Sequence, residues 1–344
     1  MTDGTFRRID EASAEYAEVA RLYRIAQQLR PGGLDGWNRE LYSRSDGKWG
    51  GLQPDGTMRL SDRGVVEQLT GSTDPMRADD QAQALATILH ESYHARIPID
   101  APNEPNAFRA RHSKGLDEGL TEHQTVADFD LFAARAGYQD LELRRHEYPG
   151  AYAAAEGLLT YAAANESDRA TLADRALDAP LVMRWDVIAD EIVRNRLADT
   201  VLSDPDHQRA ARAHLVVAMT SPQGWMTLDD SPSASGGQEI ADQSSKALDG
   251  AIADIRQHYQ DSPDRPFPAV VPNFELRERA GEQARSMAGA QAAPAAAQAH
   301  TALRFLSGSA PAAAAVHSRP NLGDGARGRT GSHGTGPEQT RGRD

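Results

Sequence analysis

The stretch LATILHESYHARIP, Leu85–Pro98, is an apolar run that contains two histidines one helical turn apart. Residues four apart lie on the same face of an α-helix, so the imidazoles of His90 and His94 can direct ring nitrogens at one metal ion. Glu91 lies about 100° around the helix from His90, within reach of water at that metal. This HExxH pattern predicts a helical metal site with Glu91 as general base.

The residues before the motif favour a helix. Ala82, Leu85, Ala86 and Leu89 are good helix formers, and Asp74-Pro75 is typical of a helix cap and first turn. A purely structural pair of histidines is the alternative interpretation. It is less favoured, because each buried imidazole would then need its own hydrogen-bond partner.

A catalytic zinc site needs a third protein ligand and an open fourth position. Downstream, SKGLDEGLTEHQTVADF (113–129) carries Glu118 and Glu122, four apart on one helical face. This segment resembles the second ligand helix of the gluzincins, the thermolysin-like metallopeptidases. The resemblance covers about residues 75–130 of the chain. It implies Zn²⁺ as cofactor, Glu118 as third ligand and Glu122 as the carboxylate that orients a ligand histidine.

Three other side chains compete with Glu118 for the place of third ligand: His112, Asp117 and His123. His112 is expected in a loop, and helical geometry turns His123 away from Glu118. Glu118 is therefore the favoured ligand.

A peptidase of this kind also needs an edge strand for the extended substrate and a donor to the oxyanion. Gly56–Ser61, just before the motif helix, is the candidate strand, with a structural hairpin as the alternative. His146, Tyr148 and Tyr152 are candidate donors. The two tyrosines are four apart and can share a helix face, although packing in the core is the commoner role of tyrosine.

Composition limits the other functions. The 344 residues contain 37 Lys+Arg and 50 Asp+Glu, a net charge of −13, which disfavours binding to nucleic acid or to an anionic membrane. Cysteine is absent, so zinc must be held by histidine and carboxylate. No signal peptide or membrane span is apparent, and a cytoplasmic location is expected, with export that needs no leader as the alternative.

The chain is expected to be mainly α, with a small β-sheet or hairpin before the HExxH helix. We predict an N-terminal helix and β subdomain at 1–72, a helical metallopeptidase core at 73–265 and a largely disordered tail at 266–344, with an optional short helix at 301–308. Predicted helices cover 11–29, 74–98, 116–136, 149–164, 168–177, 181–202, 206–220 and 239–259. Acidic residues 186, 190 and 191 are expected on a solvated helix face, with a second carboxylate cluster as the alternative.

The leading hypothesis is zinc-dependent hydrolysis of peptide bonds in a protein or peptide substrate. A metallopeptidase toxin or effector domain is a second possibility. A third is a non-catalytic, zinc-stabilised scaffold whose tail recruits partners. Glu91 disfavours the scaffold, because a structural zinc site has no need of a general base.

Overall fold

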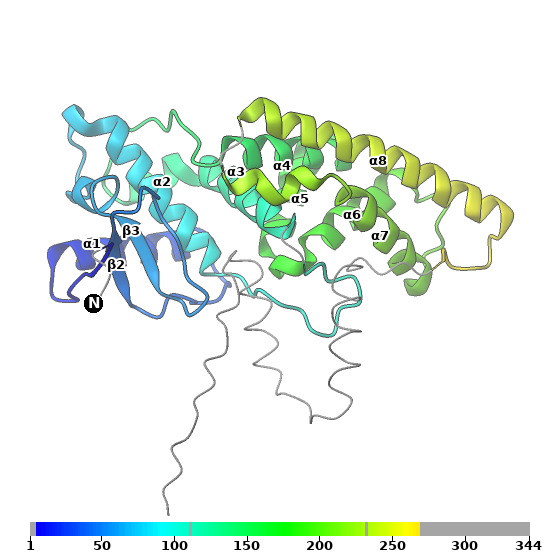
Figure 1. Ribbon diagram of the computed structural model, residues 1–344, viewed down its shortest axis with the longest axis horizontal. Coiled ribbons are helices and arrows are strands. Elements are labelled where there is room, and N and C mark those ends of the chain that lie inside the picture. Colours follow the sequence, from blue (N-terminus) through cyan, green and yellow to red (C-terminus); the bar gives the residue numbers. More distant parts are fainter. Residues whose placement is uncertain (1–4, 110–111, 231–232, 269–344) are drawn as a thin grey trace, which may run out of the picture. The chain divides into compact units, whose positions relative to one another are not determined.

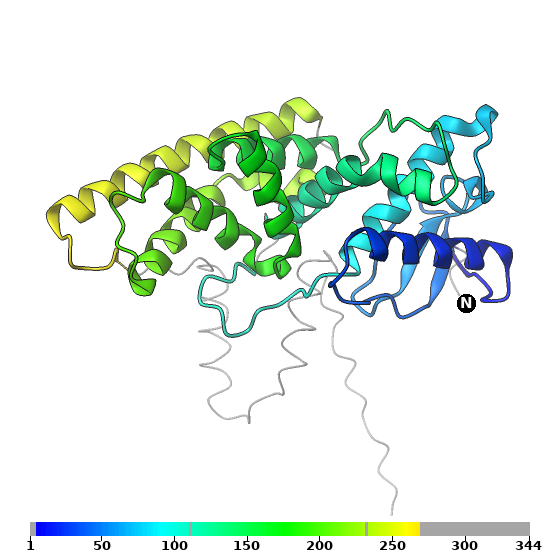
Figure 2. The same ribbon diagram turned by 180° about the vertical axis from the view of Figure 1, so that it is seen from behind.

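The structure is a computed structural model, shown in Figure 1 and from behind in Figure 2. It describes residues 5–109, 112–230 and 233–268. The predicted disordered tail therefore lies outside the described part of the chain except for residues 266–268, and so does the short helix suggested at 301–308.

Helices dominate the described residues, which confirms the predicted mainly α class. The α-helices are α1 (Ala14–Leu29), α2 (Ala78–His94), α3 (His112–Arg135), α4 (Pro149–Ala162), α5 (Glu166–Asp178), α6 (Arg184–Arg196), α7 (Pro205–Met219) and α8 (Ala234–Asp261). Short 3₁₀ turns are η1 (Val66–Gln68), η2 (Pro75–Arg77), η3 (Leu181–Met183) and η4 (Gln223–Asp230). The single helix predicted over 181–202 is thus a 3₁₀ turn followed by the shorter α6, and η4 was not predicted.

Side-chain caps explain where several helices begin. Ser13 accepts a hydrogen bond from the backbone N–H of Tyr16, so α1 begins after Ser13 and not at residue 11 as predicted. Asn165 and Ser233 cap α5 and α8 in the same way. Asp74 caps η2, which leads directly into α2. The sequence therefore located this start correctly, although its first turn is 3₁₀.

The small sheet lies before α2, as predicted, and contains β1 (Phe6–Arg8), β2 (Leu41–Arg44) and β3 (Met58–Ser61) in the order β1-β2-β3. β1 pairs antiparallel with β2, and β2 pairs parallel with β3. The chain turns at Pro54-Asp55-Gly56, where Gly56 has a φ of 86°, a conformation that favours glycine. β1 escaped prediction because it is only three exposed residues long.

The prediction of Gly56–Ser61 as a substrate-binding edge strand is wrong. β2 occupies one side of β3, and the extended segment 49–53 occupies the other. The backbone N–H groups of Arg59 and Ser61 donate to the carbonyl oxygens of Gly51 (2.9 Å) and Trp49 (2.7 Å). The turn at 54–56 folds the chain back on itself, so both edges of β3 are already paired.

Two hydrophobic cores form among the described residues. The first packs α1, α2 and the sheet against the end of α3, with Leu22, Met58 and Leu85 buried in it. The second packs α4–α8 against the start of α3, around Trp185 and Trp225. Helix α3 contributes side chains to both cores. The face of α3 that packs against α2 therefore lies at the junction of the two cores. The domain boundaries at 72/73 and 265/266 stay predictions.

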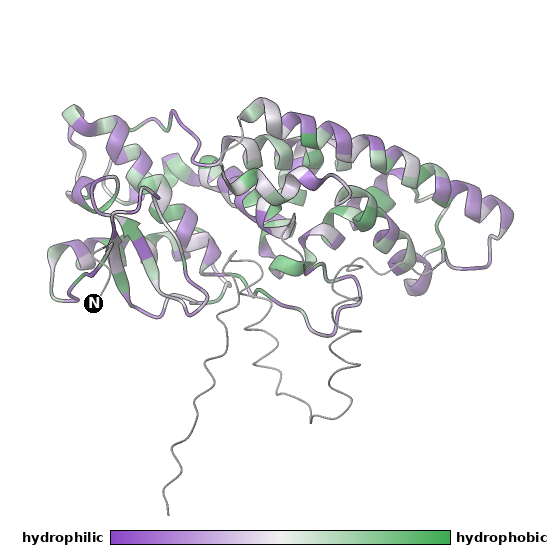
Figure 3. Cartoon of the chain, in the orientation of Figure 1, coloured by the Kyte–Doolittle hydropathy of each residue, from purple (hydrophilic) through white to green (hydrophobic). Residues whose placement is uncertain are grey.

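Helices α4 and α8 approach closely, and both views show them side by side (Figure 1, Figure 2). A Cβ atom on Gly237 of α8 would lie 2.0 Å from the carbonyl oxygen of Gly150 in α4, so glycine is needed at this crossing. Figure 3 shows hydrophobic and hydrophilic residues interleaved along α8, as expected of a helix with one buried face. No described helix combines the length and apolar character that crossing a membrane requires.

The predicted solvated acidic face of α6 is wrong for two of its three residues. Asp186 and Glu191 are both 8% exposed. Arginines of neighbouring helices pair with them: Arg212 with Asp186 at 3.0 Å and Arg175 with Glu191 at 2.7 Å. The sequence pattern did not show that α5 and α7 would bring these guanidinium groups over the carboxylates.

Candidate metal centre

Helix α2 presents the first half of the site at its C-terminal end. It is buried along nearly all its length, and His90 and Glu91 are only 1% and 2% exposed. His94 is the last helical residue. The backbone N–H of Ala95, the C-cap residue, donates to the carbonyl oxygen of Glu91. The two imidazoles therefore lie on one face at the end of a buried helix, as the spacing predicted.

Helix α3 supplies the third side chain. The Oε2 atom of Glu118 lies 3.1 Å from Nε2 of His90 and 3.3 Å from Nε2 of His94, and the two Nε2 atoms are 3.1 Å apart. Among the described residues, this triad is the one group of His, Cys, Asp and Glu side chains arranged to hold a metal ion. The three side chains predicted as ligands are thus brought together.

Carboxylates behind both imidazoles fix how the rings are presented. Nδ1 of His90 lies 3.2 Å from Oε2 of Glu122, and Nδ1 of His94 lies 3.4 Å from Oδ2 of Asp117. A carboxylate at Nδ1 favours the proton on that nitrogen and leaves the Nε2 lone pair for a metal. Glu122 therefore occupies the position predicted for it.

The triad fits a zinc ion. Three acceptor atoms converge at 3.1–3.3 Å from one another. Tetrahedral ligands at a zinc distance of about 2.0–2.1 Å are separated by about 3.3–3.4 Å. The donor set of two imidazoles and one carboxylate suits zinc.

The charge of the site favours a cation. Burial by itself would lower the pKa of His90 and His94, but the surrounding carboxylates raise the pKa of His90 well above its usual value and that of His94 to about 10. Burial would raise the pKa of Glu118, yet its contacts with both histidines lower it. The same negative potential that holds protons on these imidazoles attracts a metal ion, and protons and metal compete for Nε2.

Glu91 lies under an extended backbone segment. Burial raises the pKa of its carboxyl group, while the nearby imidazoles and a hydrogen bond from the backbone of Leu52 lower it. A Cβ atom on Gly50 would lie 2.5 Å from Oε1 of Glu91 and 2.7 Å from Cγ2 of Thr87. Glycine at position 50 thus makes room for the predicted general base.

The two candidate tyrosines occupy different places. The ring of Tyr148 stacks on His90, with centroids 5.3 Å apart. The ring of Tyr152 stacks on His146, with centroids 4.3 Å apart, and on His123, with centroids 5.9 Å apart. Tyr152 therefore lies farther from the triad than Tyr148 does. His146 contacts Glu122, with Nδ1 3.4 Å from Oε1, and does not reach the triad. Only Tyr148 contacts a residue of the triad directly.

Two of the rival ligands, His123 and Asp117, do not join the triad. His123 pairs with Glu156 at 3.1 Å, on another face of α3, as its helical position predicted. His112 is the first residue of α3 rather than part of a loop, and its side chain lies outside the description. Asp117 contacts His94 and the fully buried Arg184.

Sequence reasoning missed the supporting role of Asp117. The signal was present, because Asp117 directly precedes Glu118. Its partner Arg184 lies 67 positions away, however, and only the fold brings it close. Glu147 was missed as well. Its backbone N–H donates to Glu122 at 2.9 Å, and its carboxylate accepts from Thr87 at 3.2 Å.

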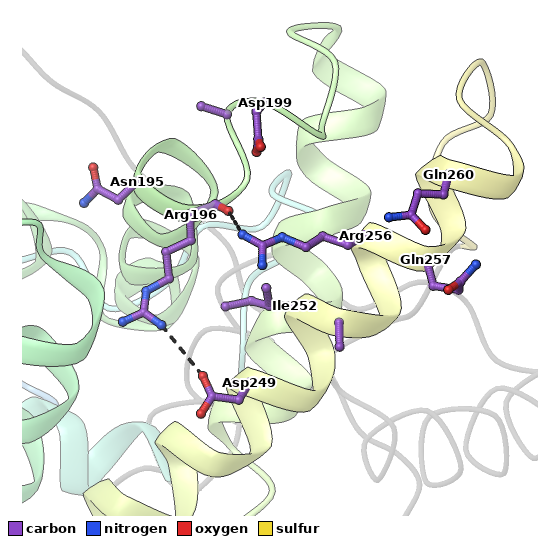
Figure 4. A pocket seen from close by; sticks show the side chains of 10 residues that line it. Asn195, Arg196, Asp199, Asp249, Ile252, Arg256, Gln257 and Gln260 are labelled. Atoms are coloured by element: carbon purple, nitrogen blue, oxygen red, sulfur yellow. Dashed lines mark hydrogen bonds and ion pairs between the residues drawn. The ribbon is translucent and has the colours of Figure 1, made fainter.

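A separate polar pocket of about 790 Å³ lies between α6 and α8. Figure 4 shows its arginines engaged with the pocket's own residues: Arg196 lies 3.7 Å from Asp249, and Arg256 donates to the carbonyl oxygen of Arg196 at 2.8 Å. None of its lining residues belongs to the triad. Because these groups already have partners, we assign no chemistry to this pocket.

Comparison of the chain with known protein families, with curated proteins and with solved structures finds no match. The established property of the site is therefore its geometry: a buried His/His/Glu group that can hold a metal ion, in a mainly helical fold.

Proposed function

We propose that this protein is a zinc-dependent metallopeptidase with the ligand arrangement of the gluzincins. One observation carries the proposal: acceptor atoms of His90, His94 and Glu118 converge on one point at the end of α2, where Glu91 is buried beside them. A purely structural zinc site would have no use for this carboxylate. The proposed substrate is a protein or a peptide.

The chain's own residues divide the work. Bound zinc supplies Lewis acidity, which brings the pKa of water at the metal to about 7. Glu91 accepts the proton of the attacking water and returns it to the leaving amine. Asp117 and Glu122 hold the two imidazoles in position through their Nδ1 atoms. Tyr148 is the proposed hydrogen-bond donor to the oxyanion, because its ring lies against His90.

The decisive experiment compares the purified protein with Glu91→Gln. Bound metal is measured by mass spectrometry, and both proteins are incubated with a denatured protein mixture. We expect about one zinc per chain in each, and cleavage only by the unmodified protein. Glu166→Gln is the matched control, since that side chain is 89% exposed, and it should cleave normally.

Other outcomes discriminate among the alternatives. Absence of zinc in both proteins would overturn the metal site itself. Zinc in both without cleavage would favour the non-catalytic scaffold. Glu118→Ala should lose the metal; retention there, with loss in His112→Ala, would show that the third ligand is misassigned.

A further inference from the structure

Glu147 lies beside the triad, held at two points. It belongs to the connection between α3 and α4, and its backbone N–H donates to the same Glu122 carboxylate that supports His90. The next residue, Tyr148, stacks on His90. The Glu147 side chain reaches back to α2, where Oε2 accepts from the hydroxyl of Thr87, one helical turn before Glu91. Glu147 thus lines the site next to Thr87, the part of α2 that directly precedes the HExxH motif.

Within the described residues, Glu147 has no cationic side chain in ion-pair contact, a property that it shares with Glu91 but not with the other carboxylates around the site. Asp117 has Arg184, Asp128 has Arg30, and Glu118 has two histidines. Within the part of the chain that the structure describes, the one hydrogen bond to the Glu147 carboxylate comes from Thr87. Thr87 also lies 3.0 Å from the carbonyl oxygen of Gln83, so its single proton is shared.

The surroundings of Glu147 also disfavour the negative charge of its carboxylate. The pKa of Glu147 is raised to about 7. Burial is the largest cause, the charges of Glu91, Glu122 and Glu118 add to the rise, and His90 opposes it. A carboxylate that is poorly hydrated and lies among others of like charge gains stability from an added cation. Glu147 is nevertheless partly exposed to solvent, so a ligand can reach it.

We propose that Glu147 determines specificity by binding a positively charged group of the substrate peptide. This inference rests on the proposed peptidase function. The ligand chemistry is an ammonium or guanidinium group, supplied by a lysine or arginine side chain near the scissile bond or by the amino terminus of the peptide. A charge-assisted hydrogen bond to Glu147, and through it to Thr87, then fixes the register of the substrate against Glu91.

Binding tests the inference independently of turnover. The zinc-loaded Glu91→Gln protein is titrated with N-acetylated octapeptides in which one lysine moves along an uncharged sequence, with norleucine as the isosteric reference. A norleucine peptide with an unblocked amino terminus forms the second arm. We expect one peptide, either the one with lysine at a particular position or the one with a free amino terminus, to bind on the order of tenfold to a hundredfold more tightly than the matching uncharged peptide.

Adding Glu147→Gln should abolish this preference while leaving the affinity for norleucine peptides within about threefold, since glutamine can still accept from Thr87. Glu142→Gln is the matched control, because it removes an exposed carboxylate from the same connection; it should keep the preference. Equal affinity for lysine and norleucine peptides at every position and in both arms overturns the inference, and so does a preference that survives Glu147→Gln.

Failure of the proposed function would look different. In that case the unmodified protein would cleave none of these peptides, whereas the affinity ratio would still be measured. If cleavage occurs with the same sequence profile before and after Glu147→Gln, the peptidase stands and the specificity assignment falls.

Discussion

Asp117 lies between a histidine of the metal triad and Arg184, which is 1% exposed. Its carboxylate therefore has two roles, orienting the ring of His94 and neutralising a buried guanidinium. Removing its charge should disturb both, but the two effects can be separated by a second substitution.

We expect Asp117→Asn to lower zinc affinity by roughly 10- to 100-fold, as loss of a carboxylate behind a ligand histidine does. It should also lower the free energy of unfolding by about 3–5 kcal/mol, because Arg184 keeps its buried charge without a partner. Chelator competition and urea unfolding measure the two quantities.

The control is Asp117→Asn combined with Arg184→Met, which removes the buried charge. Much of the stability should return in this double variant while zinc affinity stays low. Recovery of zinc affinity with stability would show that Asp117 acts on the fold alone.

Tyr148 and Tyr152 provide a second contrast at the residue scale, since only Tyr148 stacks on a triad residue. If Tyr148 donates to the oxyanion, Tyr148→Phe should lower kcat by about 10²–10³ with little change in KM. Tyr152→Phe should retain nearly full kcat. Steady-state kinetics on one peptide decide this, and equal losses in the two variants would contradict the assignment.

At the scale of helices, the crossing of α4 and α8 depends on Gly237. A methyl group there would meet the backbone of Gly150 at 2.0 Å, so Gly237→Ala should force the helices apart and cost about 1–3 kcal/mol. A methyl on Gly250, in the same helix, meets nothing within 4 Å. Gly250→Ala should therefore stabilise the protein by about 0.5–1 kcal/mol, and urea unfolding of both variants should show opposite signs.

Asp128 of α3 ties several elements together. Its carboxylate accepts hydrogen bonds from Arg30, which follows α1, at 2.8 Å and from the hydroxyl of Tyr93 in α2. Arg30 also donates a hydrogen bond to Asp174 of α5 at 2.7 Å. Burial would raise the pKa of Asp128, but these hydrogen bonds and the charge of Arg30 lower it.

A pH dependence follows, because a carboxyl group whose pKa is lower in the folded state favours folding only while it is ionised. The contribution of Asp128 should be complete above its unfolded pKa of about 4 and lost as pH falls through the lower folded value. Melting temperatures of the unmodified protein and Asp128→Asn should differ at pH 7, and the difference should shrink as the pH falls below about 4. A constant difference across this range would contradict the assignment.

At the scale of the whole molecule, the triad joins α2 to α3, and α3 belongs to both hydrophobic cores. Each core buries many large side chains, so folding should not require the metal. We expect zinc at a thousand times its dissociation constant to add about 4 kcal/mol to stability.

Calorimetry should accordingly show a lower melting temperature in chelator, reversed by zinc, while circular dichroism at 25 °C keeps its helical signal. Collapse of the helical signal in chelator would mean that the site is required for the fold. An unchanged melting temperature would mean that zinc does not bind the folded protein.

Many residues of the candidate site were predictable, because residues spaced four apart lie on the same face of a helix. His90, Glu91 and His94 follow from one helical turn, and Glu118 and Glu122 from another, together with the resemblance of that segment to a ligand helix. The failures had a common physical cause. The pairing of β3 with residues 49–53 and the burial of Asp186 and Glu191 depend on contacts between distant segments, which periodicity does not report.

The sequence by itself determined the helical class, the position of the sheet before α2 and the pairing of His90 with His94 on one helix face, because periodicity, caps and i,i+4 spacing act over a few residues. Glu118 was predicted from the resemblance of its segment to a ligand helix, and the packing of α3 on α2 brings it to the two histidines. Only the tertiary structure decided what surrounds the triad: Tyr148 rather than Tyr152 against His90, Arg184 behind Asp117, Gly50 over Glu91, and Glu147 without a cationic partner. Electrostatic and steric environments depend on distances in space, and packing sets those distances.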